Sequence, residues 1–136
     1  MKRATLIGCS LLLAISACAG VQPAAVVDPG ASFMLAPGQT AAVRGTDIRI
    51  TFRQVREDSR CPVDVTCVWA GDAKIEVTIA RNGAADDTRI LSITPPKHEA
   101  VVGNLRIRFV SLAPVPRQAD ANVPRKYLAE FVIDQI

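Results

Sequence analysis

The 136-residue chain has few of the side chains that enzymes commonly use for catalysis. It contains a single histidine, a single tryptophan and only 4% aromatic residues. The histidine, His98, lies in the segment Pro95–Glu99, which is typical of an exposed loop. An arrangement of nucleophile, base and orienting group is not recognisable, and no glycine-rich phosphate loop occurs. Acid–base hydrolysis by neighbouring carboxylates at Asp86–Asp87 or Glu57–Asp58 stays open as an alternative, but we expect a non-enzymatic protein without a cofactor.

The apolar run near the N-terminus is too short for a membrane-spanning helix. Ala4–Ala17 carries no charge and follows Lys2 and Arg3. As a helix it would reach about 21 Å, whereas the hydrocarbon core of a bilayer is ~30 Å thick. A short basic region followed by such a run predicts a signal peptide over residues 1–17.

The end of this run resembles the lipobox of bacterial lipoproteins. It reads Leu13-Ala14-Ile15-Ser16-Ala17-Cys18, with small residues directly before a cysteine. The resemblance implies cleavage before Cys18 and a lipid anchor (diacylglycerol, with palmitate-type chains) on its thiol. Ala19 resembles the sorting signal of outer-membrane lipoproteins, so we expect a cell-envelope protein on the outer membrane, facing the periplasm. An ordinary secretory peptide cleaved after Ala17 or Ala19 is the alternative.

Little net charge remains once this segment is removed. Residues 1–17 hold two of the sixteen basic residues and none of the thirteen acidic ones, so a formal charge of +3 becomes +1. Neither a basic stripe nor interleaved aromatic residues remain, which argues against nucleic acid as a partner. Cys9 leaves with the signal peptide and Cys18 carries lipid, so Cys61 and Cys67 are the cysteines left for other chemistry.

The rest of the chain predicts a lipidated cysteine with a flexible tether over residues 18–32 and one β-domain over residues 33–136. Alternation of apolar and polar residues is clear in Thr46–Arg53, where Ile48, Ile50 and Phe52 share one face. About seven strands and no convincing amphipathic helix favour a single small antiparallel β-sandwich or barrel. The expected strands are Phe33–Leu35, Thr40–Val43, Thr46–Arg53, Lys74–Ile79, Arg89–Thr94, Leu105–Phe109 and Tyr127–Ile133, the last apolar on both faces.

The segment 58–72 holds both remaining cysteines and the lone tryptophan. Outside the cytoplasm, Cys61 and Cys67 most simply form a disulfide that staples a loop between two strands, with Trp69 packed over the sulfurs. Three alternatives stay open: a redox-active cysteine pair, a metal site formed with His98, and a calcium site. The calcium ligands would be carboxylates of Asp58, Asp64 and Asp72, which with Trp69 form a candidate loop surface.

Three strings of the chain carry a resemblance to a known family. DSRCPVDVTCVWAGDAKIEV, LRIRFVSLAPVPR and YLAEFVI are similar to a family of small bacterial secreted or lipid-anchored proteins. That family shares an SRCP…CVWAG core followed by a β-strand and a Pro-rich turn. The family has no established activity, so the resemblance implies a β-domain and no catalytic residues.

Four arginines form a candidate basic face. Arg49 and Arg53 lie on the outward side of one predicted strand, and Arg106 and Arg108 on that of another. In one sheet, these side chains would form a basic surface for an envelope protein or an anionic glycan. We therefore expect an anchored, non-enzymatic β-domain that binds a protein or glycan partner. A protease-inhibitor module that displays loops is the alternative.

Overall fold

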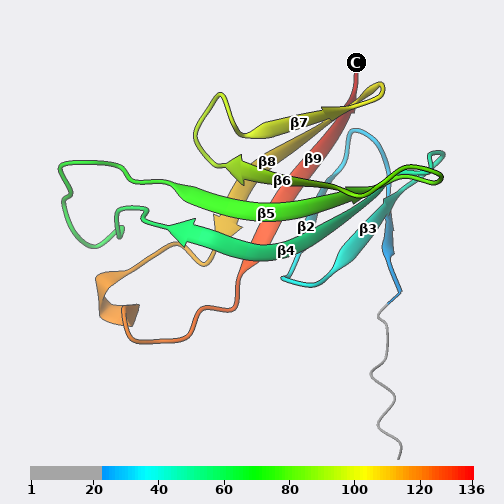
Figure 1. Cartoon of the computed structure of the whole chain (residues 1–136). Helices are drawn as coiled ribbons and strands as arrows, with labels where there is room; N and C mark the ends of the chain where they lie inside the picture. Colours follow the sequence, from blue (N-terminus) through cyan, green and yellow to red (C-terminus); the bar gives the residue numbers. More distant parts are fainter. Residues whose placement is uncertain (1–22) are drawn as a thin grey trace, which may run out of the picture.

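The computed structural model describes residues 23–136 and shows an all-β sandwich of two open sheets (Figure 1). The first sheet has the strand order β1-β3-β4-β5-β6 and the second has β2-β9-β8-β7. The strands are β1 (Ala25–Val27), β2 (Ser32–Leu35), β3 (Thr40–Val43), β4 (Arg49–Asp58), β5 (Ala73–Ala80), β6 (Asp87–Ser92), β7 (Glu99–Val102), β8 (Leu105–Ala113) and β9 (Leu128–Gln135), with a short 3₁₀ turn, η1, at Gln118–Asp120. Because both sheets have open edges, the fold is a sandwich and not a closed barrel.

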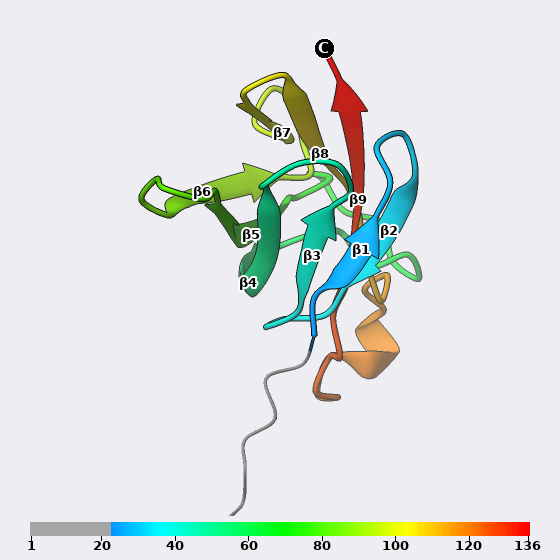
Figure 2. The ribbon, with the colours of Figure 1, turned by 90° about the vertical axis from the view of Figure 1, so that its right-hand side faces the viewer.

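Among the described strands the pairing is antiparallel, except that β1 pairs with its neighbour β3 in the parallel sense. Figure 2 shows β1 next to β3 at the edge of the first sheet, while β2 pairs with β9 in the second. The long β4–β5 hairpin runs from the Arg49–Ala80 pair to the Asp58–Ala73 pair, with two irregularities in β4 after Phe52. The chain therefore enters both sheets before it forms this hairpin.

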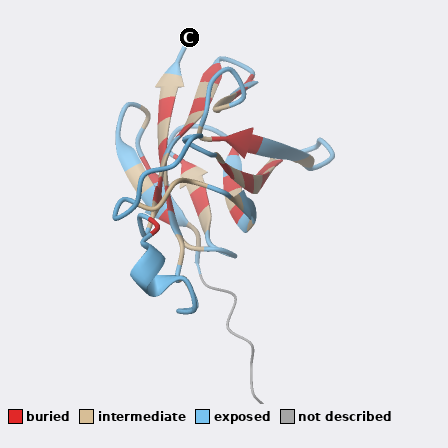
Figure 3. Cartoon of the chain, turned by 90° about the vertical axis from the view of Figure 1, so that its left-hand side faces the viewer, coloured by how far each residue is buried: buried red, intermediate tan, exposed pale blue. Residues whose placement is uncertain are grey.

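The core follows the alternation seen in the sequence. Ile48, Ile50 and Phe52 are at most 5% exposed, as predicted. The few aromatic residues are concentrated, because Phe131 packs against Phe33, Phe52 and Phe109 with ring centroids 5.8, 6.4 and 6.0 Å apart. Figure 3 shows buried positions alternating along the strands of both sheets. The core cluster formed by the described residues draws on all nine strands, so this part has the core that an independently folding domain needs.

Two short strands were missed by the sequence analysis. β7 was not predicted, and β1 falls inside the segment expected to be a flexible tether. The tether over residues 18–32 is therefore wrong for Ala25–Val27, and the domain begins before residue 33. The reason is that β1 has only three residues and its ladder partner, β3, is distant in sequence. The predicted signal peptide and Cys18 lie outside the described residues.

The structure also shows which residues of two strands face the core. In β6, Leu91 is 2% exposed and faces the core, whereas Ile90 is 47% exposed. The last strand, predicted to be buried on both faces, instead alternates between buried and partly exposed residues along β9. One face of β9 packs in the sandwich, and the other is covered only in part.

The two ends of the sandwich differ. The β4–β5 loop and the β8–β9 connection lie at one end, and the β3–β4 and β5–β6 turns lie at the other (Figure 1). Within residues 23–136, no helix has the length and apolar character needed to cross a membrane. The two long connections are exposed over most of their length (Figure 3), so they are the natural place to look for a site.

Candidate functional site

The β4–β5 loop is stapled by the predicted disulfide. Cys61 and Cys67 are bonded, with their Cα atoms 5.9 Å apart. Because both sulfurs are in the disulfide, neither is a thiolate that could bind a metal. The alternative of a metal site formed by the two cysteines and His98 is therefore wrong for the disulfide-bonded protein. The element that follows the pair is strand β5 rather than a helix, so the helix N-terminus that lowers the pKa of redox-active cysteines is missing here.

The base of this loop continues the hairpin ladder. The Ser59 N–H donates to the Asp72 carbonyl at 2.8 Å, and the Cys61 N–H donates to the Ala70 carbonyl at 2.9 Å. Gly71 has φ of +72°, and a Cβ there would lie 1.8 Å from the Ser59 carbonyl oxygen. Only glycine fits at this position, both for its backbone conformation and for this close approach. The loop is therefore held at its base as well as by the disulfide.

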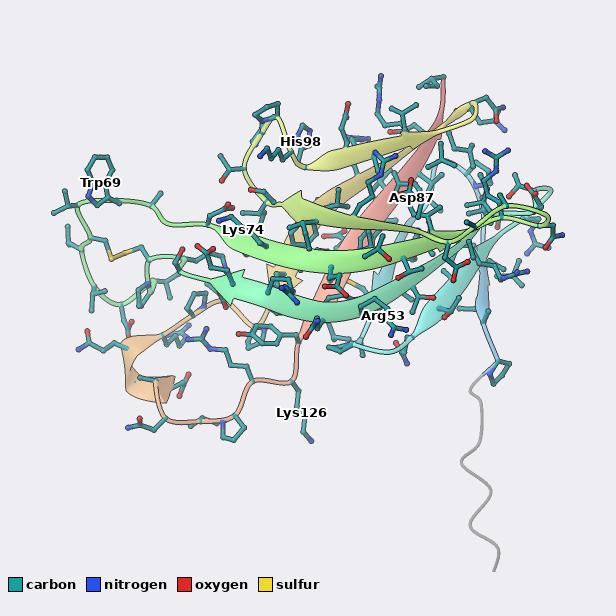
Figure 4. All side chains as sticks on the ribbon, in the orientation of Figure 1. Arg53, Trp69, Lys74, Asp87, His98 and Lys126 are labelled. Carbon is teal, nitrogen blue, oxygen red and sulfur yellow. A yellow bond between two sulfur atoms is a disulfide. The ribbon has the colours of Figure 1, made fainter. Side chains whose placement is uncertain are left out.

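The tip of the loop is apolar and exposed. Val68 is 91% exposed and Trp69 is 83% exposed. Figure 4 shows the Trp69 ring projecting from the loop into solvent, away from the body of the domain. The prediction that Trp69 packs over the sulfurs is wrong, because the ring closed by the disulfide ends at Cys67 and leaves Trp69 beyond it. The tip thus presents an indole and an isopropyl group to whatever approaches the domain.

Asp58 is the centre of a partly buried ionic cluster next to the loop. Its side chain is 5% exposed and accepts hydrogen bonds from Arg60 at 2.7 and 2.9 Å, from Arg125 at 2.8 Å and from the Tyr127 hydroxyl at 3.1 Å. Burial by itself opposes ionisation, but the hydrogen bond and charge of Arg60, the Tyr127 hydroxyl and the Arg125 charge outweigh it and lower the pKa of Asp58. Asp58 is therefore a carboxylate that joins β4 to the segment before β9.

The other two candidate aspartates are held by different partners. Asp64 accepts the backbone N–H groups of Gln118 and Ala119, at 2.7 and 3.3 Å, and these bonds lower its pKa. Asp72 accepts the hydroxyls of Ser92 and Thr94, at 2.6 and 3.2 Å. The three carboxylates do not converge, and residues 23–136 contain no group of three or more His, Cys, Asp or Glu side chains that could hold a metal ion. The calcium site predicted from the sequence, with all three carboxylates as ligands, is therefore not formed.

The four arginines do not form one face. Arg49 and Arg53 belong to β4 in the first sheet, whereas Arg106 and Arg108 belong to β8 in the second. The latter two are engaged in their own sheet, Arg108 with Asp134 at 2.7 Å and Arg106 with Glu99 at 3.5 Å. The predicted basic face is wrong, because alternation tells which side of a strand a residue occupies but not which sheet holds the strand.

A groove in the β8–β9 connection was missed by the sequence analysis. Its volume is about 450 Å³. It is lined by Ala113, Pro114, Val115, Arg117, Asp120, Val123, Pro124, Arg125, Lys126 and Leu128. The signal in the sequence was a run of prolines and valines between two strands, which predicted only an extended connection. That these residues turn back to line a groove depends on the contacts they make with the β4–β5 loop.

Those contacts join the two long connections into one structure. Arg60 donates to the carbonyls of Leu112 and Pro114, at 2.5 and 3.1 Å, and the Val63 N–H donates to the Pro116 carbonyl at 3.0 Å. The exposed loop tip and the groove are therefore parts of the same end of the domain.

Comparison of the chain with protein-family models, with curated protein sequences and with solved structures found no match.

Proposed function

We propose that the protein is a lipid-anchored envelope protein whose β-sandwich is a non-enzymatic binding module. Its partner is a protein, bound through the tip of the β4–β5 loop. The observation that carries this proposal is the exposure of Val68 and Trp69, 91% and 83%, on a loop whose base is held by a disulfide and a hydrogen-bonded ladder.

An exposed tryptophan at the end of a held loop is well suited to binding. Burying a large apolar side chain stabilises a complex by roughly 1.5–3 kcal/mol. Val68 and Trp69 are not buried by the fold, so a partner can still obtain this stabilisation from both. Tryptophan is also enriched among the residues that dominate protein interfaces. Because Cys61 and Cys67 are linked, the loop has already lost much of the freedom that binding would otherwise restrict.

A protein partner fits the tip better than a glycan does. The same loop also exposes Val63 and Val65, by 58% and 37%, so four of its large apolar side chains are open to solvent. A sugar that stacks on an indole also needs side chains that hydrogen-bond its hydroxyls. An apolar tip instead matches an apolar pocket on a protein surface.

The location of the module depends on the N-terminal segment. We propose that Cys18 carries the lipid and that the domain faces the periplasm from the outer membrane, as the lipobox and Ala19 predict. The Cys61–Cys67 disulfide agrees with an oxidising compartment. Mass spectrometry of the N-terminal peptide tests this directly: a diacylglycerol on Cys18 is expected, and an unmodified Cys18 would refute the anchor.

Photocross-linking in the intact envelope tests the binding surface. A photoreactive residue at position 69 should give one discrete protein adduct, and the same residue at Val101, which is 46% exposed on β7, should not. The substitution Val68→Asp should remove the adduct from position 69 while the domain stays folded. The proposal fails if position 69 gives no adduct, gives the adduct also seen from position 101, or links only to polysaccharide.

A further inference from the structure

The groove in the β8–β9 connection keeps apolar side chains in contact with solvent. Val115, Val123 and Leu128 line it and are 56%, 59% and 40% exposed. Pro114 and Pro124 complete the apolar part of the wall. Scattered single exposed apolar residues are ordinary, but several that converge on one concave site are a mark of ligand binding. A volume of about 450 Å³ lies in the range of small-molecule sites, roughly 300–1,000 Å³.

The groove is held open by its attachment to the β4–β5 loop. On one side, Arg60 binds the carbonyls of Leu112 and Pro114, and Val63 binds that of Pro116. On the other side, Arg125 is held by Asp58 at 2.8 Å. Because both walls are fastened, the apolar side chains are prevented from collapsing onto one another. A preformed groove of this kind binds with little reorganisation.

The charges at the groove favour an anion. Arg117 and Lys126 are exposed and form no ion pair within the described part of the chain, although the charge of Arg117 also acts on Asp64. Arg125 shares the single carboxylate of Asp58 with Arg60. Asp120 is the only acidic residue of the lining. Figure 4 shows the Lys126 side chain extending outward from the strand-to-strand connection. The exposed rim of the groove therefore carries a net positive charge next to an apolar wall.

The lining is poorly suited to an extended peptide. Proline has no N–H group, so Pro114 and Pro124 cannot donate the main-chain hydrogen bonds by which a strand is usually recognised. What the groove does offer is aliphatic surface with cationic side chains at its rim. We infer that it binds a small amphiphilic anion, with the alkyl chain against Val115, Val123 and Leu128 and the anionic head next to Arg117 or Lys126. This site is separate from the Trp69 tip and does not depend on a partner there.

Titration of residues 19–136 with decanoate, below its micelle concentration, tests the inference by calorimetry and by NMR. Saturable one-to-one binding is expected, with amide shifts concentrated in the β8–β9 connection. Butyrate has the same head and decyltrimethylammonium the same chain, so each should bind roughly tenfold or more weakly. Decyl phosphate is the second anionic probe: tighter binding of the phosphate points to a phospholipid source, and tighter binding of the carboxylate to a free fatty acid. Absence of decanoate binding, or equal binding of the cationic probe, would overturn the inference.

Matched substitutions place the site. Val123→Asp should weaken decanoate binding roughly tenfold, whereas Val101→Asp, at a valine of β7 that is 46% exposed, should leave it unchanged. Replacing Arg117 and Lys126 together by glutamine should weaken it roughly three- to tenfold and reduce its salt dependence. Equal effects of the two valine substitutions would overturn the assignment. The change Trp69→Ala should not affect decanoate, which separates this result from the fate of the proposed protein interface.

Discussion

Neutralising Asp58 should destabilise the domain strongly, because this carboxylate is shared by three donors in a nearly closed site. Asp58→Asn leaves the guanidinium groups of Arg60 and Arg125, which are 14% and 25% exposed, without their counter-charge. Removing one partner of a buried pair costs about 3–5 kcal/mol. We place the loss near 3 kcal/mol, because Arg60 keeps its bonds to the carbonyls of Leu112 and Pro114. In a domain of this size that is a fall in Tm of about 10 °C.

The pH dependence gives this prediction a second readout. The pKa of Asp58 is lower in the folded state than its ordinary value of 3.8, so its contribution to stability is present above that value. It is lost as the pH falls through the folded pKa. The difference in unfolding free energy between the wild type and Asp58→Asn should therefore be largest near neutral pH and should shrink below about pH 4.

Urea denaturation at several pH values measures both effects. Asp86→Asn is the matched control, since Asp86 is exposed and has no ion pair among residues 23–136. It should change stability by less than about 0.5 kcal/mol. A loss below about 1 kcal/mol for Asp58→Asn, or a loss that does not change between neutral and acid pH, would refute the reasoning.

Three further predictions concern the β4–β5 loop. Gly71→Ala should cost several kcal/mol, because its Cβ would meet the Ser59 carbonyl, whereas Gly83→Ala, with the same φ of +72° but open space, should cost about 1 kcal/mol. Equal losses in thermal melts would show that backbone strain alone matters. Replacing both Cys61 and Cys67 by serine should cost about 2 kcal/mol by the chain-entropy relation for so short a loop, and unchanged melting would contradict this. The emission of Trp69, the only tryptophan, should be that of a water-exposed indole and fully open to iodide quenching, and a shielded indole would contradict the exposed tip.

The strands were predictable where the local alternation of apolar and polar residues determines which side faces the core. Ile48, Ile50 and Phe52 alternate with polar residues, and this alternation alone places them on the core side. β1 and β7 escaped prediction because their sequences, AVV and EAVV, do not alternate between apolar and polar residues. β1 pairs with β3, which follows only after β2, whereas β7 pairs with the next strand, β8, across the Gly103–Asn104 turn, so a local signal was overlooked there.

The candidate site was predictable only in part, for a related reason. Two cysteines six positions apart, with an oxidising compartment expected, were enough to predict the disulfide, and the structure confirms it. The arginines Arg49 and Arg106 were placed on one face because alternation does not reveal which strands share a sheet. The groove depends on Arg60 reaching the carbonyls of Leu112 and Pro114, residues more than fifty positions away. Contacts of that range have no signature in a single sequence.

The parallel pairing of β1 has a mechanical consequence. In a chain held at its N-terminal end, tension enters at β1 and then reaches β2, and these two strands belong to different sheets. A pull must therefore break the three-residue ladder between β1 and β3, and then the four-residue ladder between β2 and β9, before the extended chain pulls on the start of β3. Of β1, only Val27 is buried, so its release would expose little of the core. Under such a pull, β1 would therefore detach first and lengthen the chain, while the rest of the sandwich stays folded.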